Sequence, residues 1–395
     1  MIIPYSKQSI SKSDIKAVTK VLRSDYLTQG PKVLEFENRI NKFVKSRFSV
    51  AVNSATSGLH LACLALGLKK GDWLWTSVNS FVASANCGLY CGAKIDLLDI
   101  DINDYNISIN LLEKKLEEAK KNNKLPKIII PVHFAGRPCK MREIFRLSKK
   151  YHFKIIEDAS HALGAKINNK KIGACNFSSM TVFSFHPVKN ITTAEGGIVT
   201  TNNKFLANKL KILRTHGINK NKKKFLTKNP PPWFFEQVDL GFNYRMNDLE
   251  GALGISQLVK LNFFIKKRNQ IANFYQKKLK DLPIILPSKD KNILNCYHLF
   301  PIRINIENSK KIRLKLFNFF KKKNIFVNVH YIPIHYHPYY AKMGFKRKDY
   351  PNLEKYYGSV MSLPIFPDIK KTQLEKIIKY LKIFFKKHKK RKKKF

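Results

Sequence analysis

The sequence is poor in acidic residues and has no long apolar run. Only 27 Asp and Glu stand against 75 Lys and Arg, which gives the 395 residues a formal net charge of +48. No window is apolar over enough residues to cross a bilayer, and the opening MIIPYSKQSISKSDIK lacks the basic, apolar and small-residue order of a signal peptide. We therefore expect no membrane insertion and a cytoplasmic location.

Cysteine is also scarce. The six cysteines are scattered, and although Cys87 and Cys91 have the spacing of one helix face, no second pair completes a zinc site. The histidines of HYIPIHYHPYY (330–340) are more typical of strand and loop packing than of a metal centre. We expect reduced, mostly buried thiols and no bound metal.

Few signals of nucleic-acid recognition accompany the basic charge, although such a charge attracts polyanions. The lysines are spread along the chain, without a zinc finger, an RNP-type stretch or basic-region heptads. Only KKHKKRKKKF (386–395) forms a dense block, which predicts a disordered basic tail. We expect no specific nucleic-acid partner, and a basic nucleic-acid-binding protein is the non-enzyme alternative.

Helical and strand patterns alternate over the first two-thirds of the chain, as in an α/β domain. Helical periodicity over 11–23 and 32–45 is followed by short apolar runs typical of parallel sheets, among them FSVAV, WLWTS, AKIDLLDID, KIIIPVHFAG and FKIIEDAS. A long helix is predicted from about residue 247 to 279. We predict a large α/β domain over 1–255 and a small C-terminal α+β domain over 256–385, with the boundary inside this helix.

Four loops that follow the strands carry groups suited to one cofactor, at the edge where open α/β sheets bind ligands. NSATSG opens a helix whose N–H groups can hold a phosphate, and Phe81 in the next such loop offers an aromatic face. KIIEDASHALG ends a strand with Asp158, and TVFSFHPVKN puts Lys189 on an irregular turn between two β-branched runs. Each motif alone fits an ordinary capped helix or a solvated loop. Together they supply the anion site, ring clamp, carboxylate and lysine that pyridoxal phosphate requires.

These motifs resemble those of the DegT-type sugar aminotransferases. The likeness rests on NSATSGLHLACLALGL, EDASHALGA, FSFHPVKNITTAEGG, RTHGI, LGFNYRMNDLEGALGISQL and VNVHYIP, and it extends in register from about residue 3 to 382. It implies a fold-type I enzyme that uses pyridoxal phosphate, with a large, mostly parallel seven-stranded sheet and a homodimer with shared active sites. PYSKQSI, LTQGPKV, IPVHFAGRPC and VNVHYIPIHYHPYY are most similar to members that serve pseudaminic acid biosynthesis.

The resemblance implies a role for each matching residue. Lys189 would be the Schiff-base lysine and the proton carrier, Asp158 would pair with the pyridine nitrogen, and Phe81 would stack on the ring. His161 stands where many members carry Gln, beside the cofactor's phenolic oxygen. The phosphate would be held by Ala55, Thr56 and Ser184, with Asn243 reaching it from the neighbouring subunit.

The implied reaction transfers an amino group from L-glutamate to C4 of a UDP-linked 4-keto-6-deoxy-N-acetylhexosamine. Another UDP- or dTDP-linked 4-keto-6-deoxy sugar is the alternative substrate. Related sugar dehydratases carry His where this chain has Lys189, which argues against a dehydratase. The resemblance places the following residues in the nucleotide-sugar pocket: Tyr5, Asp25, Tyr26, Leu27, Thr28, Ala55, Ser184, Asn243, His330, Tyr331, Ile332 and Pro333.

Overall fold

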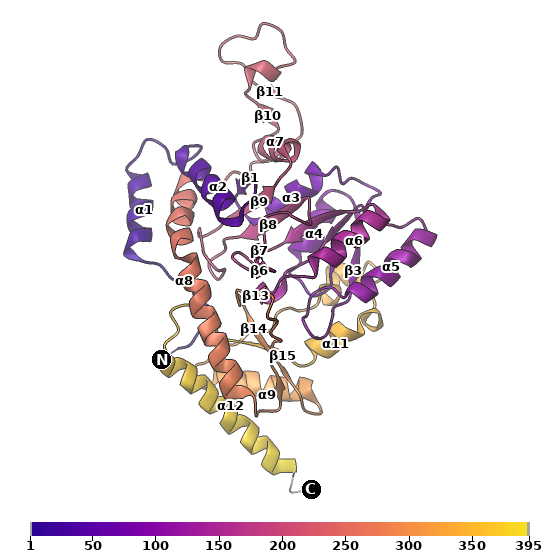
Figure 1. Ribbon diagram of the computed structural model, residues 1–395, viewed down its shortest axis with the longest axis vertical. Coiled ribbons are helices and arrows are strands. Elements are labelled where there is room, and N and C mark those ends of the chain that lie inside the picture. Colours follow the sequence, from indigo (N-terminus) through magenta and orange to yellow (C-terminus); the bar gives the residue numbers. More distant parts are fainter. Residues whose placement is uncertain (1, 393–395) are drawn as a thin grey trace.

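The computed structural model describes residues 2–392 and is built around one large sheet (Figure 1). Its order is β1-β9-β8-β5-β4-β2-β3. Neighbouring strands are parallel except where β9 pairs with β1 and β8, so β9 alone runs against the other six. The prediction of a large, mostly parallel seven-stranded sheet is confirmed. The strands are β1 Phe48–Val52, β2 Trp73–Ser77, β3 Lys94–Leu98, β4 Ile128–Ile130, β5 Lys154–Asp158, β8 Met180–Ser184 and β9 Gly197–Thr201.

Helices cover both faces of the sheet because its strands are apolar on both sides. Side chains that alternate along a strand face opposite layers, as Leu74 and Trp75 do on β2. One face packs against α3 (Ala55–Ala65), α4 (Ala83–Tyr90) and α7 (Lys204–Leu213). The other packs against α5 (Ile109–Lys121) and α6 (Met141–Tyr151) toward β3, and against α2 (Pro31–Val44) and α8 (Asp248–Leu279) toward β1.

The 32-residue helix α8 connects this layered part to the C-terminal part of the chain (Figure 1). It begins with a capping box in which Asn247 accepts a hydrogen bond from the Glu250 N–H and Glu250 accepts one from the Asn247 N–H. Its later turns join a separate cluster of buried apolar residues. That cluster is formed with β12 (Ile284–Ile285), β14 (Phe300–Ile304), β15 (Val360–Leu363), α9 (Ser309–Lys321) and α12 (Lys371–Lys392). The domain boundary at residue 255 stays a prediction.

The C-terminal helix is longer than the sequence pattern indicates. We expected a disordered tail from residue 386, whereas α12 continues to Lys392. Lysine and arginine are good helix formers, and positive charge is favoured at a helix C-terminus, so a basic run can extend a helix that tertiary packing has already started. Residues 393–395 of the predicted tail lie outside the described residues.

The segment between β10 (Ile218–Asn219) and β11 (Glu236–Gln237) projects from the body of the molecule (Figure 1). These two short strands pair with each other at its base. The remaining elements are short except α1, which packs on α8. They are α1 Lys12–Leu22, β6 Lys166–Ile167, β7 Lys170–Lys171, β13 Ile293–Leu294, α10 Pro338–Ala341, α11 Pro351–Tyr357 and the 3-10 helices Phe134–Gly136, Lys222–Lys224, Ile334–Tyr336 and Arg347–Asp349.

Candidate active site

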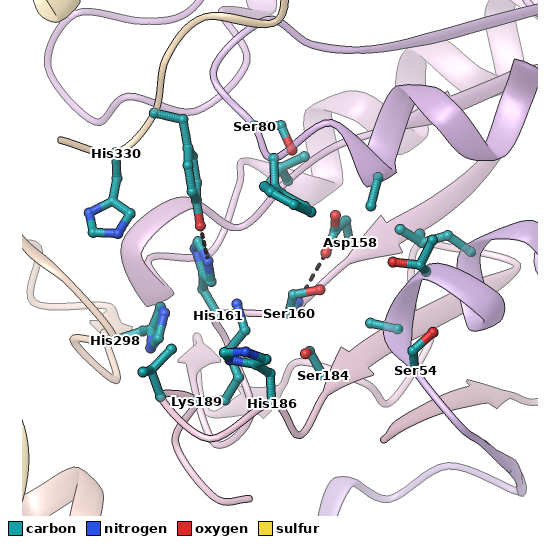
Figure 2. Close-up of a pocket in the computed structure, with 18 of the residues that line it drawn as sticks. Ser54, Ser80, Asp158, Ser160, His161, Ser184, His186, Lys189, His298 and His330 are labelled. Atoms are coloured by element: carbon teal, nitrogen blue, oxygen red, sulfur yellow. Dashed lines mark hydrogen bonds between the residues drawn. The ribbon is translucent and has the colours of Figure 1, made fainter. Parts of the chain in front are cut away.

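A cavity of about 360 Å³ lies at the edge where β1, β2, β5 and β8 end and β9 begins (Figure 2). This is the edge at which open α/β sheets bind ligands, because the loops that leave neighbouring strands converge there. The sheet therefore brings residues far apart in the sequence to one space. Of the predicted site residues, those that line the cavity are Tyr5, Ala55, Thr56, Phe81, Asp158, His161, Ser184, Lys189, His330 and Tyr331.

Lys189 stands on the turn between β8 and β9, and its half-buried side chain lines the cavity (Figure 2). Backbone hydrogen bonds hold the turn: the N–H of Phe185 donates to Gly196 at 2.9 Å and that of Thr193 donates to Phe185 at 3.0 Å. The Lys189 N–H donates to the His186 carbonyl at 2.9 Å. Gly196 has a φ of +154°, which glycine adopts more readily than other residues. The lysine is thus carried on a defined turn.

Burial lowers the pKa of Lys189 to about 8, against a smaller opposing effect of the negative charge of Asp158. Only the neutral amine condenses with an aldehyde. We therefore expect cofactor-free protein to take up pyridoxal phosphate about tenfold faster at pH 9 than at pH 7, whereas an ordinary lysine would gain about a hundredfold. Stopped-flow absorbance from pH 7 to 9 measures this, with an exposed model lysine as control. A hundredfold rise for the protein would contradict the lowered pKa.

Asp158 ends β5 and is buried, with its carboxylate held from both sides. The Ser160 N–H donates to Oδ1 at 3.0 Å, and the Ser84 hydroxyl donates to Oδ2 at 2.6 Å. Ser84 is in turn 2.7 Å from the Ser80 hydroxyl. Buried charges need such partners, and hydrogen bonds also fix the direction of the carboxylate. The carboxylate is therefore oriented before any ligand binds.

The N-terminus of α3 forms another wall of the cavity. Ser54 caps the helix by accepting the Ser57 N–H at 3.1 Å, and Ala55 and Thr56 of the first turn line the cavity. The N–H groups of a first helical turn, together with the helix dipole, favour anions. A phosphate fits this end of the cavity, with the Ser184 hydroxyl at the facing end of β8.

Gly197 allows this helix terminus to approach the sheet. A Cβ at residue 197 would lie 2.5 Å from the Ala55 nitrogen and 2.5 Å from the Ser54 carbonyl carbon. We expect Gly197→Ala to lower the free energy of unfolding by about 1–3 kcal/mol and to weaken pyridoxal phosphate binding, because the helix terminus must shift. Urea unfolding and cofactor titration measure the two effects. Gly358→Ala is the control, because a Cβ at residue 358 would have its nearest contact at 3.2 Å. Equal losses of stability and of cofactor affinity in the two variants would contradict this account.

A cluster of rings closes the side of the cavity next to Lys189. The Tyr331 hydroxyl and His161 Nε2 are 2.9 Å apart, and the His161 and His298 ring centroids are 4.3 Å apart. Burial, followed by the positive charge of Lys189, lowers the pKa of His161 well below its usual value. Burial likewise lowers the pKa of His330 to about 3. These imidazoles are therefore neutral at physiological pH and can exchange hydrogen bonds without adding positive charge beside Lys189.

The residues present fit pyridoxal phosphate. The cavity offers an anion site at α3, a carboxylate, an amine and the Phe81 ring within one space. Nδ1 of His161 is buried without a hydrogen-bond partner among the described residues, which is costly unless a bound group provides one. Phe81 is 60% exposed although it borders the cavity, and a stacked ring would cover part of that surface.

The other predicted residues lie elsewhere in the described part of the chain. Asp25 and Tyr26 border a separate groove beside α1, and Thr28 is exposed. Their part in a substrate pocket stays a prediction. Asn243 is exposed and pairs through its backbone with Thr215, and its reach into a neighbouring subunit stays a prediction. Three further predicted residues do not line the cavity: Leu27 is exposed, the side chain of Ile332 is half-exposed, and Pro333 is buried.

The cavity also includes residues that the sequence patterns do not identify. His298 comes from the segment just before β14, and Asn328 precedes the predicted stretch that contains His330. Nothing near His298 in the sequence distinguishes it from a core residue of YHLFPIRIN. Others could have been found from the loops already identified, namely Ser54, Ser80, Ser160, His186 and Glu195.

Among the residues whose side chains the structure describes, no group of three or more His, Cys, Asp or Glu is arranged to hold a metal ion. Two of the histidines in the 330–340 stretch contact different partners. Nδ1 of His330 is 2.9 Å from the Ser362 hydroxyl, and Nε2 of His335 is 3.2 Å from the Glu354 carboxylate. The described helices also include none long and apolar enough to span a membrane.

The chain is similar over nearly its whole length to sugar aminotransferases. It is 40% identical to the UDP-4-amino-4,6-dideoxy-N-acetyl-β-L-altrosamine transaminase of Campylobacter jejuni over 92% of each chain. Among solved structures, PseC of Helicobacter pylori, an aminotransferase involved in the biosynthesis of pseudoaminic acid, has a TM-score of 0.90 and 32% identity, covering 98% of this chain and 100% of that one. The pyridoxal phosphate form of the putative sugar aminotransferase Spr1654 of Streptococcus pneumoniae has a TM-score of 0.88 and 26% identity, covering 98% and 99%.

The model of the DegT/DnrJ/EryC1/StrS aminotransferase family matches residues 8–382. That range includes the lysine, the carboxylate and the helix terminus around the cavity. The expectation of a pyridoxal phosphate cofactor is therefore confirmed by the family and its solved members. The chain belongs to the DegT/DnrJ/EryC1/StrS family and is a pyridoxal phosphate-dependent sugar aminotransferase.

Proposed function

We propose that the protein transfers the amino group of L-glutamate to C4 of a UDP-linked 4-keto-6-deoxy-N-acetylhexosamine. The product is UDP-4-amino-4,6-dideoxy-N-acetyl-β-L-altrosamine, an intermediate of pseudaminic acid biosynthesis, and the enzyme works in the cytoplasm as a homodimer. The observation that carries the proposal is the joint placement of Lys189, Asp158 and the α3 N-terminus around one cavity. The choice of sugar is supported by 40% identity to a transaminase named for that product.

When bound, pyridoxal phosphate supplies an electron-withdrawing ring that stabilises negative charge at the carbon from which a proton is removed. The N-terminus of α3 and Ser184 would hold its phosphate, and Asp158 would keep positive charge on its ring nitrogen. His161, neutral and hydrogen-bonded to Tyr331, would offer its buried Nδ1 to the phenolic oxygen of the ring. These contacts would hold the cofactor in one orientation through both half-reactions.

Lys189 moves the protons of both half-reactions. Its amine takes a proton from the α-carbon of glutamate and, in the second half-reaction, delivers one to C4 of the sugar. A pKa near 8 suits both tasks at neutral pH, because the amine is neither permanently charged nor too weak a base. Tyr5 and His330 border the cavity on the side of the C-terminal part of the chain, where we place the nucleotide sugar.

The near-visible absorption spectrum of the purified protein tests the donor half-reaction. We expect a cofactor band that bleaches on addition of L-glutamate, with release of 2-oxoglutarate. The bleached protein is then offered UDP-linked 4-keto-6-deoxy-N-acetylhexosamines of the L-altro and D series, and a dTDP-linked 4-keto-6-deoxyhexose. Return of the band first and fastest with the L-altro precursor supports the proposal. If the band returned only with another sugar, the proposed substrate would be wrong but the transamination reaction would stand.

A further inference from the structure

The side chains of Tyr331 and His161 meet at the wall of the cavity (Figure 2). The Tyr331 hydroxyl is 2.9 Å from Nε2 of His161, whereas Nδ1 of His161 is buried and has no hydrogen-bond partner among the described residues. A neutral imidazole carries one proton, so one of its nitrogens donates a hydrogen bond and the other accepts one. The part that the Tyr331 hydroxyl plays at Nε2 therefore decides what Nδ1 can offer to a ligand.

Ring packing holds the imidazole in this arrangement. The Phe134 ring lies edge-on to both side chains, with its centroid 6.1 Å from that of His161 and 6.2 Å from that of Tyr331. The His298 ring lies 4.3 Å from that of His161 at an interplanar angle of 34°. Because aromatic neighbours restrict the rotation of a buried ring, the hydrogen bond to Tyr331 belongs to a packed unit.

The main chain next to Tyr331 is also fixed. The Tyr356 hydroxyl donates to the carbonyl of His330 at 2.9 Å, and Nδ1 of His330 is 2.9 Å from the Ser362 hydroxyl. The phenol of Tyr331 is therefore presented to His161 by a segment that is itself held by two hydrogen bonds.

The direction of the hydrogen bond follows from the group that Nδ1 would meet. The phenolic oxygen of pyridoxal phosphate is a hydrogen-bond acceptor, so Nδ1 of His161 must carry the proton in order to bind it. Nε2 then carries none and accepts from the Tyr331 hydroxyl. The charge states agree with this direction, because burial lowers the pKa of His161 and raises that of Tyr331. The imidazole is therefore neutral, and the phenol keeps the proton that it donates.

We propose that Tyr331 is a positioning residue that donates to Nε2 of His161 and so keeps the imidazole proton on Nδ1, available to the cofactor. This inference rests on the proposed contact between His161 and the cofactor, and it gives Tyr331 a role besides its expected one in the sugar pocket. Without the hydroxyl, the proton could move to Nε2, and Nδ1 would then turn a lone pair toward an oxygen that also accepts.

Nitrogen NMR of the full-length protein, labelled at histidine, shows which ring nitrogen carries the proton. Protonated and unprotonated ring nitrogens have widely separated chemical shifts, and the signals of His161 are those lost in His161→Leu. We expect a protonated Nδ1 and an unprotonated Nε2 in the wild type, with and without pyridoxal phosphate. Tyr331→Phe keeps the ring but removes the donor, so in the cofactor-free protein part of the His161 population should carry its proton on Nε2.

The pH dependence of the near-visible cofactor band gives a second readout. A hydrogen-bond donor at the phenolic oxygen makes the cofactor less basic, so Tyr331→Phe should raise the midpoint of this titration by about 0.5–1 pH unit, the loss expected for one hydrogen bond. In the His161→Leu background, Tyr331→Phe should raise it no further, because the imidazole that carries the effect is gone.

Tyr275→Phe is the matched control. Tyr275 is buried outside the described lining of the cavity, and its hydroxyl donates to the Pro364 carbonyl at 2.8 Å. Its loss removes one buried tyrosine hydrogen bond, and it should leave both the His161 signals and the titration midpoint as in the wild type.

A proton on Nε2 of His161 in the wild type would overturn the proposal, as would wild-type nitrogen signals in Tyr331→Phe. An equal rise of the titration midpoint with and without His161 would also overturn it, because Tyr331 would then act by another route. Neither readout uses an amino donor or a sugar. A failure of the proposed transamination would therefore leave these results unchanged, and their failure would leave the transamination standing.

Discussion

Lys189→Ala should abolish the bleaching of the cofactor band by L-glutamate and lower transamination by at least about 10⁴-fold. Lys189 is the amine that lines the cavity beside Asp158, and its pKa of about 8 leaves a substantial neutral fraction at physiological pH. On the role that we propose for Lys189, its loss would remove both the covalent attachment of the cofactor and the carrier of two protons. Spectra of the variant with added pyridoxal phosphate, followed by single-turnover mixing with glutamate, measure this effect.

Two controls separate this role from a loss of structure. Lys211→Ala removes an exposed lysine of α7 and should leave both the band and the rate unchanged. Methylamine added to Lys189→Ala should restore part of the proton transfer, because a small amine can occupy the emptied space. Turnover of Lys189→Ala within tenfold of wild type, without added amine, would falsify the assignment.

Asp158→Asn should have the second largest effect, a fall of about 10²–10³-fold in the glutamate half-reaction with the protein still folded. The substitution keeps the size of the side chain but removes its negative charge. On the proposed role, that charge keeps the ring nitrogen of the cofactor positive, and the one other carboxylate in the described lining of the cavity is Glu195, on the turn that also carries Lys189. Single-turnover rates at saturating glutamate measure this effect on chemistry independently of binding.

Ser84→Ala is the matched control for Asp158→Asn. It deletes the 2.6 Å hydrogen bond to the Asp158 carboxylate but leaves the charge, so we expect a fall of no more than about tenfold. If both variants lost the same amount, orientation rather than charge would be the contribution of Asp158. If Asp158→Asn kept the wild-type rate, the residue would have no part in the reaction.

Local patterns were sufficient for the parts of the site that follow directly from strand ends. The apolar run before Asp158 and the two runs around Lys189 predict strands, and the ends of parallel strands meet at one edge. The sheet confirms that these residues come together, with Asp158 at the end of β5 and Lys189 after β8. Such residues could be predicted because their positions depend on hydrogen-bonded register and side-chain alternation, which repeat over short distances in the chain.

In stretches without regular structure, fewer of the predicted residues line the cavity, and their place in the nucleotide-sugar pocket stays a prediction. The stretch from Asp25 to Thr28 lies beside α1 rather than at the cavity, and His330 and Tyr331 line the cavity whereas the next two residues do not. In an irregular segment each side chain takes its own direction, so neighbours in sequence need not share a site. The length of α12 was also missed, because a dense basic run carries no apolar period to mark where a helix ends.

By itself, the sequence determined the α/β alternation, the residues at the strand ends and, through its motifs, the resemblance to the sugar aminotransferases. Only the tertiary structure decided which side chains touch. It placed the Ser84 hydroxyl on Asp158, which is 74 residues away, joined Tyr331 to His161 across 170 residues, and brought Cys63 beside Cys87. The physical reason is that strand and helix periodicity is encoded within a few residues, whereas these contacts depend on how whole elements pack against one another.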